Sequence, residues 1–155
     1  MNKDITQIEI VQITSQSQLE QCAAMYAEAY KGEPWNDNWT NDTAFALLSC
    51  YYHTPNFMGW LAISDGVIVG CCIGNIEPYY SGNNFILKEL FVSVRSQKTG
   101  IGQSLLSAVK TDTEPRGVKL IFLFTRKVIA DFYVKFGFAE MHEMCTMLYK
   151  VPDVN

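Results

Sequence analysis

Two glycines with one residue between them, Gly100 and Gly102, stand where the apolar run 85–94 gives way to a helix-like run. The first turn of a helix exposes unpaired backbone N–H groups and the positive end of the helix dipole. Glycines there remove the Cβ atoms that would keep a ligand away from these donors, and Lys98 can add positive charge. The spacing predicts a cradle for an anion, most often a phosphate. A tight turn that packs the helix on the strand is the alternative.

Two well-known phosphate-binding motifs do not match this joint. A P-loop carries a lysine and a serine or threonine directly after its second glycine, whereas Gln103 and Ser104 follow Gly102. A dinucleotide-binding fingerprint needs a small residue where this chain has Leu105. The glycines therefore belong to another class of anion site or to a purely structural turn.

A single acidic residue, Glu89, lies among the apolar residues of the run 85–94. In a regular strand, side-chain alternation would put Glu89 on the same face as Leu87 and Phe91. A carboxylate on an apolar strand costs free energy unless it is paired or functional. Desolvation raises the pKa of such a group and makes it a better proton acceptor near neutral pH. Glu89 is a candidate base or substrate-orienting group, and an ion pair or a solvent-facing edge position is the alternative.

The elements that must position these residues form one alternating pattern. Apolar periodicity predicts strands and helices in a single mixed α/β domain. The expected elements cover 7–14, 19–30, 42–53, 57–63, 67–76, 85–94, 101–113, 118–124, 129–136 and 138–151, the last of them a strand. Asp65-Gly66 between two apolar runs predicts a tight hairpin. The run 118–124 is almost continuously apolar, which is typical of a central strand covered on both faces.

Composition narrows the class of protein. The 155 residues are 48% apolar and 18% charged, as expected of one folded domain over 1–155. A net charge of −4 argues against nucleic acid as a partner and tolerates a cationic small substrate. Neither a signal peptide nor a membrane-spanning run is visible, so we expect a cytoplasmic protein with no membrane partner. Five cysteines without paired spacing and two histidines predict reduced, packed thiols and no metal site.

The segment around the glycines resembles the acetyl-CoA-binding segment of the GNAT (GCN5-related) N-acetyltransferase superfamily. That signature is Q/R-x-x-G-x-G/A, and residues 97–102 read QKTGIG between a strand and an amphipathic helix. A second segment, IADFYVKFGF at 129–138, is similar to the family's A-x-x-F-Y-x-K-x-G-F stretch. The order of elements also matches, so the resemblance covers essentially the whole chain. It departs at 93–94, where the family often has Asp-Pro, and at 125–127, where the family often has an asparagine.

The resemblance implies a fold and a co-substrate. The GNAT fold is a single α/β domain with a mixed, mostly antiparallel sheet, a splayed parallel pair of central strands and about four flanking helices. Acetyl-CoA would bind with its pyrophosphate at the backbone of 97–102 and its pantetheine arm along the strand before it. The implied cofactor-binding residues are Leu90, Phe91, Val92, Gln97, Lys98, Thr99, Gly100, Ile101, Gly102, Gln103 and Tyr133.

The resemblance also implies catalytic roles. The accepting amine must lose its proton, because an alkylammonium has no lone pair, and the departing thiolate can take one. Glu89 would be the base, directly or through water, and Tyr133 the acid beside the cofactor sulfur. Without its flanking motif, Tyr133 would be predicted to be a core aromatic of an amphipathic helix.

The acceptor side of the site is expected at the loop between the first two helices, EPWNDNWT at 33–40. Carboxylates and aromatic faces together suit a cationic amine. The predicted substrate-binding residues are Glu33, Trp35, Tyr79 and Glu89. The alternative is a hydrophobic lid anchored by the two tryptophans, with the acids of the loop solvated.

These residues predict an N-acetyltransferase that moves an acetyl group from acetyl-CoA to a primary amine of a small cationic molecule within a ternary complex. A non-catalytic CoA-binding module and an acetyltransferase acting on a protein N-terminus or lysine are the alternatives. An unrelated nucleotide-binding domain is a third. The resemblance also allows a homodimer.

Overall fold

The computed structural model describes residues 7–153. The chain divides into two compact units, Met1–Phe124 and Thr125–Asn155, which are taken in turn. The first unit contains the sheet and the three longest helices, and the second contains one short helix and an extended segment.

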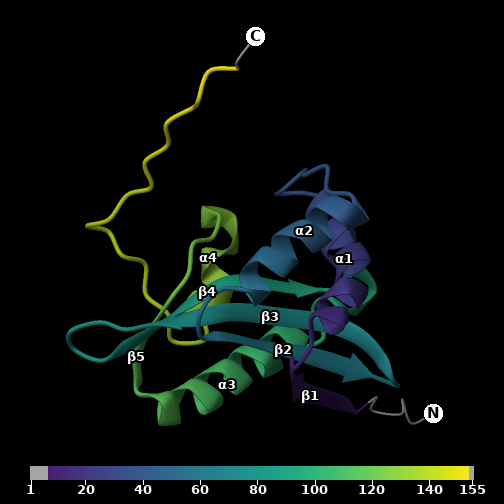
Figure 1. The fold of residues 1–155 in the computed structure, drawn as a ribbon, viewed down its shortest axis with the longest axis horizontal. Helices are drawn as coiled ribbons and strands as arrows, with labels where there is room; N and C mark the ends of the chain where they lie inside the picture. Colours follow the sequence, from purple (N-terminus) through teal and green to yellow (C-terminus); the bar gives the residue numbers. More distant parts are fainter. Residues whose placement is uncertain (1–6, 154–155) are drawn as a thin grey trace. The chain divides into compact units, whose positions relative to one another are not determined.

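A five-stranded sheet forms the centre of the first unit (Figure 1). Its strands stand in chain order, β1 to β5, so each strand pairs with its neighbour in the sequence. The first three pairings of this order, from β1 to β4, are antiparallel, and β5 lies parallel to β4. The strands are β1 (Ile8–Gln12), β2 (Phe57–Ser64), β3 (Val67–Glu77), β4 (Asn83–Val92) and β5 (Val118–Phe122).

Helices cover both faces of this sheet (Figure 1). Helices α1 (Gln16–Lys31) and α2 (Asn41–Tyr52) lie on one face, and α3 (Ile101–Thr113) lies on the other. The buried stripe of α1 has the three- and four-residue spacing that predicted this helix. The stripe consists of Leu19, Cys22, Ala23 and Tyr26. It packs with Leu61, Cys71, Ile73 and Phe91 of the sheet in one apolar core.

The predicted hairpin between β2 and β3 is confirmed. Asp65 and Gly66 have φ values of 50° and 76°, the positive pair that a two-residue turn between twisted strands requires. The packed thiols are confirmed only in part, since Cys50 and Cys145 are exposed. The other three cysteines are buried.

A β-bulge in β4 decides which way the central side chains face. Ile73 of β3 pairs with Glu89, but the next residue, Gly74, pairs with Leu87, so Lys88 is an extra residue in β4. Gly74 allows this close approach, because a Cβ there would lie 2.3 Å from the backbone oxygen of Ile86. One inserted residue reverses the side-chain alternation of the strand.

The bulge makes one sequence expectation wrong. Glu89 lies opposite Ile73 and faces the core formed with α1 and α2, as Phe91 does. Leu87 lies opposite Gly74 and faces α3, on the other side of the sheet. Alternation without the bulge had placed Leu87 and Glu89 on one face.

The parallel pair β4–β5 separates part-way along β4. The last paired residues are Ile86 and Phe122, whereas β4 continues to Val92. Along 87–92, β4 therefore pairs only with β3 among the described strands. Its other edge offers backbone N–H and C=O groups to a ligand.

The position of β5 differs from the sequence prediction. In the described sheet β5 is an edge strand, and Leu120 is 52% exposed. An almost continuous apolar run indicates that the strand is mostly surrounded by apolar side chains. It does not indicate the position of the strand in the sheet, because that position depends on pairing with strands far away in the chain.

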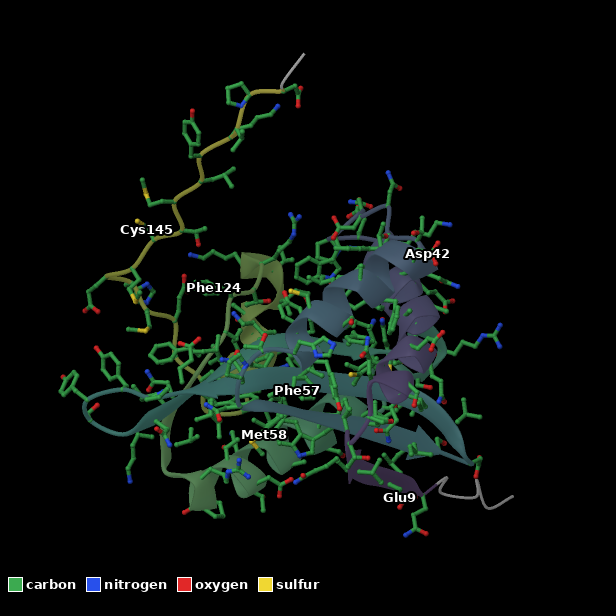
Figure 2. The ribbon with its side chains drawn as sticks, viewed as in Figure 1. Glu9, Asp42, Phe57, Met58, Phe124 and Cys145 are labelled. Carbon is green, nitrogen blue, oxygen red and sulfur yellow. The ribbon has the colours of Figure 1, made fainter. Side chains whose placement is uncertain are left out.

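The second unit contains α4 (Ala130–Val134), whose aromatic rings pack locally. Tyr133 contacts Phe132 and Phe138, with ring centroids 5.1 Å and 5.6 Å apart. The strand predicted at 138–151 is wrong, because this stretch forms no strand and Cys145 lies on an extended segment (Figure 2). Apolar residues give a segment strand propensity, but a strand also needs a neighbour for its backbone hydrogen bonds, and no described strand pairs with this segment.

The bulge gives a first prediction. Gly74→Ala should destabilise the fold by about 3 kcal/mol, because the new methyl group meets a backbone oxygen that cannot move without undoing the bulge. Chemical denaturation measures this change. Gly32→Ala is the matched control, since no atom lies within 4 Å of a Cβ there. Equal stability of the two variants would show that the bulge does not depend on Gly74.

Candidate active site

Two tyrosines of α1 hold the carboxylate of Glu89. The Tyr26 hydroxyl donates to Oε1 at 3.1 Å, and the Tyr30 hydroxyl donates to Oε2 at 2.7 Å. The two tyrosines are four residues apart and therefore lie on one face of α1. The bulge turns Glu89 toward that face, so both carboxylate oxygens are engaged from the same helix.

Burial dominates the electrostatics of Glu89. Desolvation raises the pKa of its carboxyl group, the hydrogen bonds from Tyr30 and Tyr26 lower it, and nearby Asp37 raises it again, with a net upward shift. Within residues 7–153 no lysine or arginine forms an ion pair with Glu89. The ion-pair alternative is therefore not what the structure shows.

The phenols around Glu89 keep their protons at neutral pH. Burial, and after it the charge of Glu89, raises the pKa of Tyr26 and of Tyr51. A phenol that stays protonated remains a donor to the carboxylate. Tyr26 therefore stabilises the charged form of Glu89 without becoming charged itself.

The loop between α1 and α2 packs against the same tyrosines. The ring of Trp35 meets that of Tyr30 at 5.2 Å, and the ring of Trp39 meets that of Tyr26 at 5.2 Å, both edge to face. The indole Nε1 of Trp39 donates to Asp37 at 3.2 Å, which places that acid in the same cluster. Trp35 thus lies one ring away from a residue that contacts Glu89.

Two other predicted substrate residues lie apart from this cluster. Glu33 is exposed in the loop. Tyr79 lies in the β3–β4 connection, is 55% exposed and contacts the ring of Tyr80 in a tilted arrangement. The end of that hairpin, where Glu77 pairs with Asn84, is about 13 Å along the strands from the Ile73–Glu89 pair.

The predicted anion cradle is an irregular loop that leads into α3. Lys98 and Gly100 have φ values of 61° and 89°, so both are left-handed, and Gly100 is the N-cap of α3. No side chain caps α3, and the amides at 101–103 have no acceptor within the helix. These donors are available to an anion.

Two glycines shape the cradle in different ways. A Cβ on Gly100 would have no neighbour closer than 4.0 Å, so its positive φ, rather than a lack of space, requires glycine. On β3, a Cβ on Gly70 would lie 2.8 Å from Ile101 and 3.1 Å from Leu105. The start of α3 is therefore pressed onto the sheet. The tight turn and the uncapped donors, posed as alternatives from the sequence, are both present.

Comparison with known proteins identifies the family. A model of the acetyltransferase (GNAT) domain matches residues 55–140. The chain belongs to the GNAT acetyltransferase family. The GNAT fold predicted from the sequence is confirmed, with its mixed sheet and its parallel β4–β5 pair.

Solved structures show the same fold at low sequence identity. One is the aminoglycoside N-acetyltransferase AAC(6')-Iy in complex with CoA, with 17% identity, a TM-score of 0.72 and coverage of 97% of this chain and 99% of that one. Another is a possible acetyltransferase from Clostridium difficile 630, with 16% identity, a TM-score of 0.78 and coverage of 94% and 99%.

A third solved structure is an aminoglycoside acetyltransferase from an uncultured soil metagenomic sample in complex with sisomicin. It is 18% identical, with a TM-score of 0.72 and coverage of 94% and 97%. No curated protein sequence matches the chain.

The cradle of this GNAT acetyltransferase fits the family's co-substrate, acetyl-CoA. Uncapped amides at the start of α3 suit the pyrophosphate, and the unpaired edge of β4 suits the amide groups of a pantetheine arm. The side chain of Phe91 faces α1 and α2, and those of Leu90 and Val92 face α3. Because these side chains point above and below the sheet, the edge of β4 at these three residues offers backbone groups to the ligand.

The described part of the chain contains neither a membrane-spanning helix nor a metal-binding cluster. No helix within residues 7–153 is long and apolar enough to span a bilayer. No group of three or more acidic, cysteine or histidine side chains in that part could bind a metal ion.

Sequence reasoning missed the two residues that touch Glu89. Tyr26 and Tyr30 lie within the helix predicted at 19–30, and their spacing indicates only an apolar face of that helix. A signal was available, because two tyrosines at helical spacing on a buried face both need partners for their hydroxyl groups. What the sequence could not supply was the identity of the partner.

The hydrogen bonds to Glu89 generate a second prediction. Tyr30→Phe removes a bond that favours the carboxylate, so the pKa of Glu89 should rise further and the acidic limb of the kcat/KM profile should move to higher pH. Below this limb the variant should lose activity, and well above it the loss should be smaller. Acetylation rates measured across pH test this.

Tyr52→Phe is the matched control for this experiment. Tyr52 donates to the backbone oxygen of Thr14 at 3.4 Å and does not contact Glu89. An acidic limb that stays in place in Tyr30→Phe, or moves equally in both variants, would show that the limb does not report the protonation of Glu89.

Proposed function

We propose that this acetyltransferase transfers the acetyl group of acetyl-CoA to a primary amine of a small cationic molecule, with both substrates bound at once. The observation that carries the proposal is the state of Glu89, a partly buried carboxylate held by two phenols and paired with no cation of the described chain. Such a group is costly for stability, and a function at the site accounts for it.

The surroundings of Glu89 favour a cationic acceptor. Asp37 adds a second negative charge near Glu89. The rings of Tyr30, Trp35 and Trp39 offer aromatic faces in the same cluster, which attract cations. An ammonium group entering here would supply the positive charge that residues 7–153 do not place beside Glu89. Two of the similar structures are aminoglycoside acetyltransferases, one in complex with CoA and one in complex with sisomicin.

Each group of the chain has a defined task in this proposal. Acetyl-CoA supplies the acetyl group as a thioester. Glu89 accepts a proton from the bound ammonium, directly or through water, and so frees the lone pair of the amine. Tyr133 gives a proton to the leaving thiolate. The backbone of 97–103 holds the pyrophosphate, and the edge of β4 at 90–92 aligns the pantetheine arm. Glu33, Trp35 and Tyr79 are proposed to contact the acceptor.

The role of Glu89 gives a third prediction. Glu89→Gln keeps an oxygen acceptor for one tyrosine but cannot take a proton, so kcat should fall by about 100-fold or more. Thiol release from acetyl-CoA over a panel of amines measures it. Glu28→Gln, the same change at an exposed position of α1, is the matched control.

Measuring CoA binding to Glu89→Gln distinguishes a loss of catalysis from a loss of the folded structure. Glu89→Gln should still bind CoA in calorimetry, because the cradle at 97–103 is a different part of the chain. If Glu89→Gln turns over as fast as Glu28→Gln on every amine, Glu89 is not the base.

A further inference from the structure

One acid of the loop between α1 and α2 has no task in the reaction proposed above. Asp37 is half-buried, and its carboxylate accepts the hydrogen bond from Nε1 of Trp39 at 3.2 Å. The other acid of this loop, Glu33, is exposed. Asp37 is therefore the acid of the loop that the structure places among the residues around Glu89.

The backbone of Asp37 holds the loop on the end of α1. Its N–H group donates to the carbonyl oxygen of Tyr30 at 3.0 Å. Tyr30 is the second-last residue of α1, and the last four carbonyl groups of a helix find no partner inside the helix. The bond therefore satisfies an end group of α1, and it ties Asp37 to the residue whose hydroxyl donates to Glu89.

The side chain of Asp37 is connected to the second tyrosine. The indole of Trp39 that donates to Asp37 also packs edge to face on the ring of Tyr26, with centroids 5.2 Å apart. Tyr26 in turn donates to Oε1 of Glu89. Both tyrosines that hold Glu89 are thus linked to Asp37, Tyr30 through the backbone and Tyr26 through Trp39. These contacts give the carboxylate of Asp37 a defined place in the cluster around Glu89.

The charge of Asp37 acts on Glu89. Burial is the main cause of the raised pKa of Glu89, and the charge of Asp37 raises that pKa in addition. Lys88 precedes Glu89 in β4, but it is exposed and forms no ion pair with Glu89 in the described chain. The other titratable groups around Glu89 are phenols and thiols, which are uncharged when protonated. They are Tyr26 and Tyr30 of α1, Tyr51 of α2, and Cys71 and Cys72 of β3.

We infer that Asp37 is a positioning residue for Glu89, held by Tyr30 and Trp39 so that its negative charge strengthens Glu89 as a base. A negative charge nearby stabilises the protonated form of a carboxylate, so Glu89 takes the proton of a bound ammonium more readily. The accompanying disadvantage is a smaller ionised fraction of Glu89 in acid. The inference rests on the proposed function, in which Glu89 is the base.

Asp37→Asn tests the charge alone, because asparagine is nearly the same size and its side-chain oxygen can still accept from Trp39. The pKa of Glu89 should fall, so the acidic limb of the kcat/KM profile should move to lower pH, opposite to Tyr30→Phe. Above the limb, kcat should fall by roughly 3-fold, because Glu89 is then a weaker base. A merely structural defect would lower activity at every pH and leave the limb in place.

Two further variants keep the test decisive. Asp37→Glu retains the charge, so its acidic limb should stay near that of the wild type even if the longer side chain weakens the bond to Trp39. Glu28→Gln removes one negative charge from an exposed position of α1 and should leave the limb in place. A limb that moves equally in Asp37→Asn and Glu28→Gln would show a response to net charge and would overturn the inference.

A titration of Glu89 by NMR, without substrate or turnover, separates this inference from the proposed function. At low salt, where charges are least screened, the midpoint should be lower in Asp37→Asn than in the wild type, Asp37→Glu and Glu28→Gln. If the midpoint falls in this way but no amine is acetylated, the proposed function fails and the action of Asp37 on Glu89 stands. A midpoint that is unchanged or higher in Asp37→Asn overturns the inference.

Discussion

The site depends on one carboxylate that is held in apolar surroundings, without a counter-cation among residues 7–153. Hydrogen bonds to a charged group are worth about 1.5–3 kcal/mol each, and Glu89 receives two. Its pKa is nevertheless raised, so the desolvation of the carboxylate, together with the charge of Asp37, outweighs both bonds. The native fold therefore pays a stability cost at neutral pH for keeping this group ionised. A cationic acceptor reduces that cost when it binds, which links recognition of the substrate to proton transfer.

One inserted residue in β4 creates the geometry that this carboxylate needs. Lys88 shifts the register, so Glu89 turns from the α3 face to the α1 face, where the two tyrosines are. The same region of β4 is where pairing with β5 stops and the strand edge becomes free. Gly74 is the residue that lets the neighbouring strand follow the bulge. The acid and the open edge thus come from one local distortion of a regular sheet.

Local patterns in the sequence predicted much of this structure. The stripe of α1, the Asp65-Gly66 turn and the strand-to-helix joint at Gly100 each depend on residues within a few positions of one another. Glu89 was singled out because a lone acid in an apolar strand conflicts with simple burial.

Long-range contacts decided the features that the sequence did not reveal. Alternation cannot show a bulge whose cause is Gly74 on another strand, so Leu87 was placed on the wrong face. The partners of Glu89 lie about sixty positions earlier in the chain, where tyrosine is also an ordinary core residue. The apolar run at 118–124 did not reveal that it would form an edge strand, because the order of strands is set by pairing.

The pKa of Glu89 is the most direct test of this account. The side-chain carboxyl carbon can be followed by NMR across pH and assigned by its disappearance in Glu89→Gln. The account predicts a titration midpoint above the value of about 4.3 for an ordinary glutamate. A midpoint at or below that value would show that the hydrogen bonds offset the desolvation of the carboxylate. It would contradict the claim that a bound cation is needed to stabilise the charged form of Glu89.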